Sequence, residues 1–144
     1  METANWEKVN ISEIFKISYG NKLDLCDMTI KKNGIAFISR SSNNNGISGY
    51  VEKLENIEPY PANCLTIALG GSIGCTFLQK QPFYTAQNVA VLKPVESLPD
   101  AVLLVISTLI QKECEKRFVA FGRELNNMII RMMSVNLFNT IRMF

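Results

Sequence analysis

Amide, hydroxyl and cationic side chains crowd into one short segment past the middle of the chain. They fall within nine residues and comprise Lys80, Gln81, Tyr84, Thr85, Gln87 and Asn88. Acidic residues are absent from the whole stretch between Pro59 and Val95. Such a surface combines hydrogen-bonding groups with positive charge, which is what a polyanion with readable base edges requires. Ordinary polar positions on strands and loops explain the same pattern, and composition alone favours that interpretation.

A second polar segment without acids follows the apolar run Gly34–Ser39. It reads Arg40-Ser41-Ser42-Asn43-Asn44-Asn45-Gly46. Arginine can bind guanine, and asparagine can bind adenine, through paired hydrogen bonds in the major groove. A loop whose asparagine side chains satisfy their own backbone has the same composition. The segment is therefore predicted to be either a DNA-contacting loop or a purely structural one.

The sequence offers little for catalysis. It has no histidine, which excludes Ser-His-Asp triads, Cys-His pairs and imidazole metal sites. Neither glycine motif that cradles nucleotide phosphates occurs. The cysteines are far apart, with no C-x-x-C pair, and are predicted to be reduced, partly buried thiols: Cys26, Cys64, Cys75 and Cys114. We predict no catalytic residue, no cofactor and no metal.

Charge is distributed unevenly along the chain. The net charge is only +2, but Ile14–Arg40 carries the cations Lys16, Lys22, Lys31, Lys32 and Arg40 against Asp24 and Asp27. A local basic surface on a nearly neutral protein is typical of a sequence-specific DNA binder, and also of a merely solvated face. The polar N-terminus lacks an export signal, and the apolar run Ala101–Ile110 is far shorter than the ~20 residues of a membrane span. We expect a cytoplasmic protein without a membrane segment.

A central hairpin should position these polar segments. Cys64–Leu69 and Ile73–Leu78 are predicted to pair as antiparallel strands about Gly70-Gly71, because a type I′ turn needs positive φ at both central residues. Further strands are predicted at Phe15–Ser18, Gly34–Ser39, Ile47–Leu54 and Ser134–Phe138, the first after a short turn capped by Ser12. A helix is predicted at Ala101–Arg117, with Ser97 as its cap and its apolar first half buried. A second helix is predicted at Arg123–Met133. Together they indicate a single α+β domain over residues 1–144, with short antiparallel strands and C-terminal helices.

Several short motifs, taken in order, resemble the target recognition domain of the DNA specificity subunit of type I restriction-modification systems, and of related type II systems. The resemblance spans nearly the whole chain. Each motif is weak alone, but their order and spacing are fairly specific. They are Trp6 with Ile14-Phe15 and Gly20, Ile35–Ser39 followed by Asn45–Ile47, Leu65–Gly74, Phe83–Pro94, and Phe121–Asn126.

The resemblance implies a compact β-rich domain that grips half of a split double-stranded DNA target through its loops. It implies delivery of that DNA to a methyltransferase partner and, in complete systems, to a restriction subunit, with no active site in this chain. Gln87, Asn88 and Arg123 fall within the matching motifs. With the polar segments, the predicted DNA-contacting residues are Lys22, Arg40, Ser41, Asn43, Asn44, Asn45, Lys80, Gln81, Tyr84, Thr85, Gln87, Asn88 and Arg123.

The resemblance implies that a complete specificity subunit contains two such domains, separated by long helices that form a coiled coil. The chain departs from that arrangement. One domain is present here, without a long heptad helix and without the Leu-Pro that usually introduces it. We therefore expect half of a subunit, acting with a second recognition domain or as a homodimer that would read a palindrome. Alternatives are a fragment that docks on a methyltransferase through Ala101–Ile110 and Met128–Met133 without reading DNA, and a small-ligand-binding β domain with Phe77, Phe83 and Tyr84.

Overall fold

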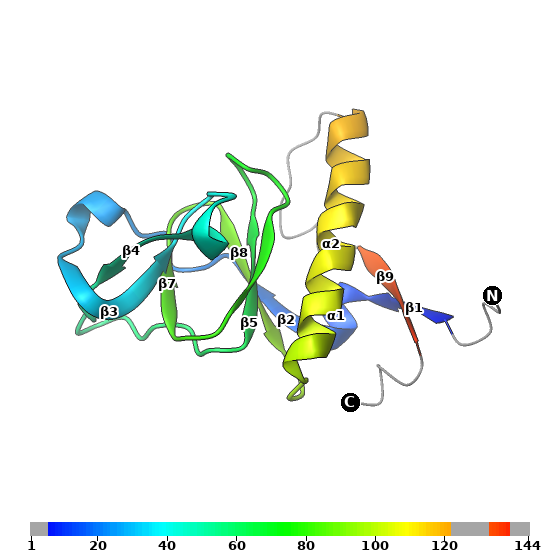
Figure 1. The fold of residues 1–144 in the computed structure, drawn as a ribbon, viewed down its shortest axis with the longest axis horizontal. Helices are drawn as coiled ribbons and strands as arrows, with labels where there is room; N and C mark the ends of the chain where they lie inside the picture. Colours follow the sequence, from blue (N-terminus) through cyan, green and yellow to red (C-terminus); the bar gives the residue numbers. More distant parts are fainter. Residues whose placement is uncertain (1–5, 122–132, 139–144) are drawn as a thin grey trace.

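Three small β-sheets and one long helix follow one another along the long axis of the molecule (Figure 1). The structure is a computed structural model, and it describes residues 6–121 and 133–138. A three-stranded sheet lies at one end, a four-stranded sheet in the middle, then helix α2 (Asp100–Phe121), and a two-stranded ribbon at the other end. The β-rich α+β class predicted from the sequence is confirmed.

The central sheet is antiparallel throughout. Its order is β2 (Phe15–Ser18), β8 (Val89–Pro94), β5 (Cys64–Ala68) and β6 (Thr76–Gln79). One face packs through Leu65, Ile67 and Leu92 in the same cluster as buried residues of α2, and the other packs through Cys64, Val89 and Val91 against the three-stranded sheet. Burial of both faces explains why β5 is apolar or buried at every position rather than alternating.

The three-stranded sheet has the order β4 (Ile47–Val51), β3 (Ile30–Ile38) and β7 (Phe83–Thr85). β3 runs antiparallel to β4 and parallel to β7. Val51 is opposite both Ile30 and Ile35, so residues 31–34 bulge out of the ladder. The predicted strand at Gly34–Ser39 therefore begins earlier than expected, at Ile30, and the strand predicted at Ile47–Leu54 ends at Val51. The 3₁₀ turns η1 (Leu25–Asp27) and η2 (Asn44–Gly46) flank β3.

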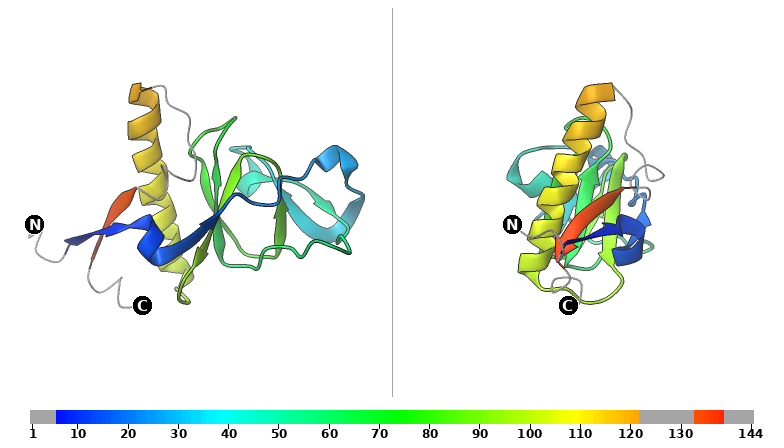
Figure 2. Two further views of the ribbon diagram at one scale, coloured as in Figure 1. Left: turned by 180° about the vertical axis from the view of Figure 1, so that it is seen from behind. Right: turned by 90° about the vertical axis from the view of Figure 1, so that its right-hand side faces the viewer.

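The two ends of the described chain pair with each other. β1 (Trp6–Asn10) runs antiparallel to β9 (Ser134–Phe138), with Trp6 opposite Phe138. Figure 2 shows this ribbon beside α2, on the side away from the three-stranded sheet. The predicted strands Phe15–Ser18 and Ser134–Phe138 have the expected bounds. The short turn before β2 is α1 (Ile11–Ile14), which follows Asn10, so Ser12 is not its cap.

The connection between β5 and β6 differs from the predicted hairpin turn. Residues 69–75 form a longer loop, in which Gly71 and Gly74 take positive φ (58° and 86°) and Gly70 does not. The prediction of a two-residue turn at Gly70-Gly71 is therefore wrong. A β-carbon at Gly74 would lie 2.7 Å from Cys114 Cβ, so glycine at this position lets the loop pack closely against α2.

Helix α2 covers the predicted range and extends it at both ends. Its N-terminus is Asp100, where the Leu103 N–H donates to the Pro99 carbonyl (3.1 Å), rather than the predicted cap at Ser97. Its apolar first half is not wholly buried, because Leu104 and Val105 are 52% and 45% exposed on the face away from the sheet. The helix predicted at Arg123–Met133 lies outside the described residues, apart from Met133.

The cysteines occupy different environments. Cys64 and Cys114 are buried, Cys75 is half-buried and Cys26 is exposed. Burial raises the pKa of the Cys64 thiol to about 11, which keeps it protonated at neutral pH. Within the described residues, no three Cys, Asp or Glu side chains gather where they could hold a metal ion. The same residues contain no helix with the length and apolarity needed to span a membrane.

Candidate nucleic-acid interface

A hollow of about 370 Å³ opens where the end of β3, the turn before β8 and the segment before η1 meet. We call it the Arg40 hollow. Its apolar part consists of Leu23, Leu25, Phe37 and Ala86. Its polar part consists of Asp24, Ser39, Arg40, Ser48, Gln87 and Asn88. The hollow therefore brings together residues from both polar segments that the sequence singled out.

The turn between β7 and β8 presents Gln87 and Asn88 to solvent. Its backbone is fixed on both sides: the Ala86 N–H donates to the Ile38 carbonyl, and the Leu69 N–H donates to the Asn88 carbonyl, both at 2.8 Å. Asn88 has φ 58°, a conformation that asparagine tolerates better than most residues. Both side chains are exposed, so their amide groups are available to a ligand.

The loop between β5 and β6 packs directly on Arg40. A β-carbon at Gly70 would lie 3.1 Å from Arg40 Nη1, and one at Gly71 would lie 3.0 Å from the Arg40 carbonyl oxygen. The Ser72 N–H also donates to that carbonyl (3.2 Å). Glycine at these positions lets the loop approach closely. The exposed Arg40 side chain is thus braced against a neighbouring loop at the rim of the hollow.

Two predicted DNA-contacting residues are instead part of the interior. Tyr84 and Thr85 are fully buried. The Tyr84 hydroxyl donates to the Ile57 carbonyl (2.7 Å) and accepts from the Leu54 N–H (2.9 Å). Thr85 Oγ1 accepts from the Asn21 N–H (2.7 Å), and the Thr85 N–H donates to Asn21 Oδ1 (3.0 Å). Their polar groups join loops to β7, so the fold leaves neither side chain free for DNA.

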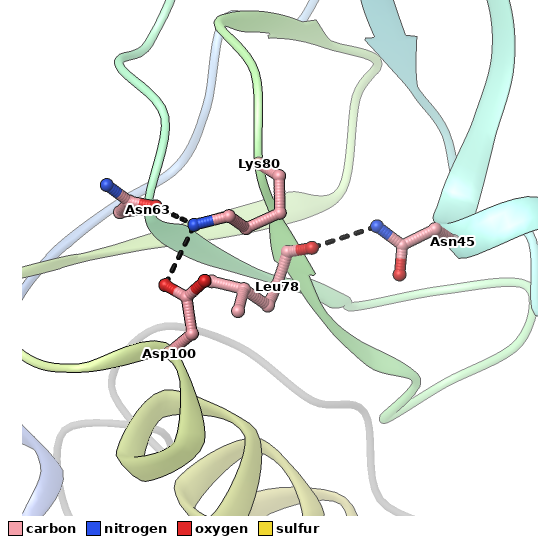
Figure 3. Close-up of polar contacts among 5 residues, drawn as sticks. All are labelled: Asn45, Asn63, Leu78, Lys80 and Asp100. Carbon is pink, nitrogen blue, oxygen red and sulfur yellow. Dashed lines mark hydrogen bonds and ion pairs between the residues drawn. The ribbon is translucent and has the colours of Figure 1, made fainter.

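Lys80 and Asn45 use their polar groups within the protein, as Figure 3 shows. Lys80 Nζ lies 2.8 Å from Asp100 Oδ1 and 2.6 Å from Asn63 Oδ1. The expectation of an acid-free surface is therefore wrong at Lys80, because the start of α2 brings in a carboxylate from outside the acid-free stretch. Asn45 Nδ2 donates to the Leu78 carbonyl (2.9 Å), which ties η2 to β6.

The remaining predicted residues that the structure describes do not line the hollow. Asn44 donates to the Ile47 carbonyl (3.2 Å), and Ser41 Oγ accepts from the Asn43 N–H (3.0 Å). For Asn44 and Ser41 the structural-loop interpretation accounts for the polar side chains. Lys22 is exposed with Nζ 5.1 Å from the centre of the Tyr19 ring, and Gln81 is exposed beyond β6. Arg123 lies outside the described residues.

Sequence reasoning missed the contribution of Asp24, which it counted only against the basic surface. Asp24 lines the Arg40 hollow, and its Oδ1 accepts from the Cys26 N–H (2.9 Å) at the start of η1. Ser39 and Ser48, also missed, lie in the same hollow and are hydrogen-bonded to each other. Aspartate often forms a local turn by accepting a hydrogen bond from the backbone N–H two residues later, as Asp24 does here. Nothing in the sequence shows that this turn lies beside Arg40.

Comparison with known proteins gives the family. Residues 3–137 match the sequence model of the family described as the type I restriction modification DNA specificity domain. The chain belongs to this family. The resemblance noted in the sequence is thereby confirmed. The family does not favour the alternative of a docking fragment that reads no DNA. Among curated proteins, no relative matches the chain.

Solved structures share the fold of this specificity domain. The S subunit of a type I restriction-modification system from M. genitalium has a TM-score of 0.77 and 13% identity, over 97% of this chain and 36% of its own. The HsdS subunit from Thermoanaerobacter tengcongensis has a TM-score of 0.68 and 15% identity, over 95% and 34%. A third structure, described as the basis of complex assembly and conformational transition of the type I R-M system, has a TM-score of 0.69 and 17% identity, over 93% and 34%. The chain thus spans about a third of the length of these relatives.

Proposed function

We propose that this specificity domain recognises one short sequence in double-stranded DNA through the Arg40 hollow. The observation that carries the proposal is the meeting of Arg40, Gln87 and Asn88 in one hollow although two different polar segments supply them. All three side chains are exposed. Among the described residues, none of the three side chains makes a hydrogen bond or an ion pair within the protein, so their donors and acceptors can face base edges.

The chemistry of this site is binding rather than bond making. An arginine can donate two hydrogen bonds to guanine O6 and N7, and an asparagine or glutamine can pair with adenine N6 and N7. Lys22, which is adjacent in sequence to Leu23 and Asp24 of the hollow, would hold the DNA backbone without reading sequence. Methylation and cleavage of the DNA belong to partner subunits in this proposal, which fits the family's description as a specificity domain.

The proposed partners follow from the family. They are a methyltransferase subunit, a restriction subunit in complete systems, and a second recognition domain or a second copy of this chain, in the cytoplasm. A lone domain would read an asymmetric half-site, whereas a two-fold dimer would read a palindrome. The symmetry of the selected DNA sequence therefore reports which arrangement operates.

The test is selection of duplexes from a random pool, followed by binding measurements on the selected site and on single-base variants. Arg40→Ala should remove about 1 to 3 kcal/mol of discrimination at one base pair while the midpoint of thermal unfolding stays close to that of the unaltered chain. Asn88→Ala should act similarly at another position. Asn88→Gly is the cleaner variant, because glycine adopts positive φ without strain.

Lys80→Ala is the matched control, since its cation already pairs with Asp100 at an exposed site. This variant should keep the selected sequence and lose less than about 1 kcal/mol of stability. If both hollow variants retain full discrimination, the hollow is not where this domain reads DNA. If the chain selects no sequence at any salt concentration, the proposed function itself is wrong.

A further inference from the structure

A carboxylate shares the Arg40 hollow with the guanidinium, yet the two do not pair. Asp24 and Arg40 both line the hollow. Among the described residues, the ion pairs join Lys53 to Glu58 and Lys80 to Asp100, so neither residue is neutralised. Asp24 Oδ1 accepts one hydrogen bond from the Cys26 N–H, and no partner within the described part of the chain occupies Oδ2. An exposed carboxylate oxygen thus remains available in a site proposed for DNA.

A free carboxylate on a DNA-binding surface is unfavourable unless it has a specific partner. It repels the phosphates that supply most of the non-specific affinity. Its natural partner in the major groove is an exocyclic amine, because cytosine N4 and adenine N6 are the hydrogen-bond donors displayed there. A G·C pair also places the guanine acceptors that suit Arg40 beside the cytosine donor. One base pair can therefore satisfy both charged groups of the hollow.

We propose that Asp24 is a second specificity-determining residue, which accepts a hydrogen bond from an exocyclic base amine, cytosine N4 in the first place, beside the base that Arg40 contacts. The inference rests on the proposed function of the hollow. It assigns the hollow a donor and an acceptor of opposite charge, and hence a preference for a G·C base pair over a pair that lacks either partner. Aspartate is a residue type that accepts from cytosine N4 in protein–DNA contacts.

The decisive variant is Asp24→Asn in the full chain. The amide oxygen can still accept from the Cys26 N–H, so the turn at η1 is retained, while the negative charge is lost and a donor appears. Two effects of opposite direction should follow. Binding to unrelated duplexes should become tighter, because phosphate repulsion falls, and discrimination for one C·G pair in the selected site should drop from roughly tenfold to near parity.

Asp27→Asn is the matched control. Asp27 is an exposed acid in the same 3₁₀ turn but does not line the hollow. It should show the same gain in non-specific binding and keep the discrimination at the C·G pair. A merely electrostatic role for Asp24 would make the two variants indistinguishable, and that result would overturn the inference.

Modified duplexes identify the base amine directly. In a Watson–Crick pair, a methyl group on cytosine N4 or adenine N6 replaces the N–H that faces the major groove. Substitution with N4-methylcytosine in the selected site should weaken binding of the unaltered chain and leave Asp24→Asn unaffected. The same pattern with N6-methyladenine instead supports the exocyclic-amine contact and assigns it to adenine. If the unaltered chain binds both modified duplexes as tightly as the unmodified one, the inference is overturned while the proposed function stands. If that chain selects no sequence at all, both are overturned.

Discussion

The Tyr84 hydroxyl binds two points of the loop after β4, which lies outside the helices and strands. It donates to the Ile57 carbonyl and accepts from the Leu54 N–H, at 2.7 and 2.9 Å, from a ring that is fully buried. Gln87, three positions later in the sequence, is exposed on the turn before β8. Polar side chains that are close in sequence thus divide between holding the fold and facing solvent.

Tyr84→Phe should destabilise the domain without changing which DNA it selects. The substitution leaves a backbone donor and a backbone acceptor without their partner. Each such loss costs about 1 to 3 kcal/mol for a buried group, and the lower end of that range is expected here because Leu54 and Ile57 are half-buried. Urea unfolding measures the change in the free energy of unfolding. Tyr19→Phe is the control, because Tyr19 is 51% exposed and its ring, against which Lys22 packs, is kept. Altered DNA selection by a stably folded Tyr84→Phe protein would contradict the interior role.

At the same scale, composition identified Arg40, Gln87 and Asn88, which the fold brings together. It could not separate them from Tyr84 and Thr85, because burial depends on where Asn21, Leu54 and Ile57 lie in space. Asp24 was missed for the converse reason. Its negative charge is unfavourable near DNA phosphates, and only the fold shows that Asp24 lines the same hollow as Arg40.

Among the elements, strands were predicted best where local composition decides them. β2 and β9 have the expected bounds, and β5 differs by one residue. The turn after β5 was predicted wrongly, because a Gly-Gly pair indicates backbone freedom but not which glycine takes positive φ. In the fold, the two glycines with positive φ are Gly71, packed against Arg40, and Gly74, packed against Cys114 of α2, and both contacts are distant in sequence. The loop that results is the element that braces the Arg40 side chain.

Gly70→Ala should therefore reduce sequence discrimination while leaving stability almost unchanged. Gly70 does not have positive φ, so alanine fits its backbone. The added methyl would lie 3.1 Å from Arg40 Nη1 and 3.4 Å from its Cδ, and the flexible side chain must move to accommodate it. Binding to the selected duplex and its single-base variants measures the loss at the base pair that Arg40→Ala also affects.

Gly49→Ala provides the control, because a β-carbon there meets nothing within 4 Å. Gly71→Ala provides a contrast, since its φ of 58° and its contact with the Arg40 backbone should make it destabilising. Full discrimination by Gly70→Ala, together with loss of discrimination by Arg40→Ala, would mean that the loop does not orient the guanidinium.

For the whole molecule, the near balance of charge limits how it can hold DNA. The chain has 15 Lys and Arg residues against 13 Asp and Glu residues. Some cations are engaged at a distance from the hollow, as Lys80 is with Asp100. In the proposed function, a few local phosphate contacts hold the DNA, and base contacts supply most of the preference for one sequence.

The salt dependence of binding should therefore be shallow. With about two to four phosphates contacted, the logarithm of the binding constant should fall with the logarithm of salt concentration with a slope of roughly −2 to −4. Lys22→Gln, which removes an exposed cation next to Leu23 and Asp24 of the hollow, should make the slope shallower by about 1. Lys80→Gln should leave it unchanged, because that cation is already paired. Titrations of one labelled duplex at several salt concentrations measure the slopes. A much steeper slope, unaffected by Lys22→Gln, would mean that DNA lies along a different and more basic face of the domain.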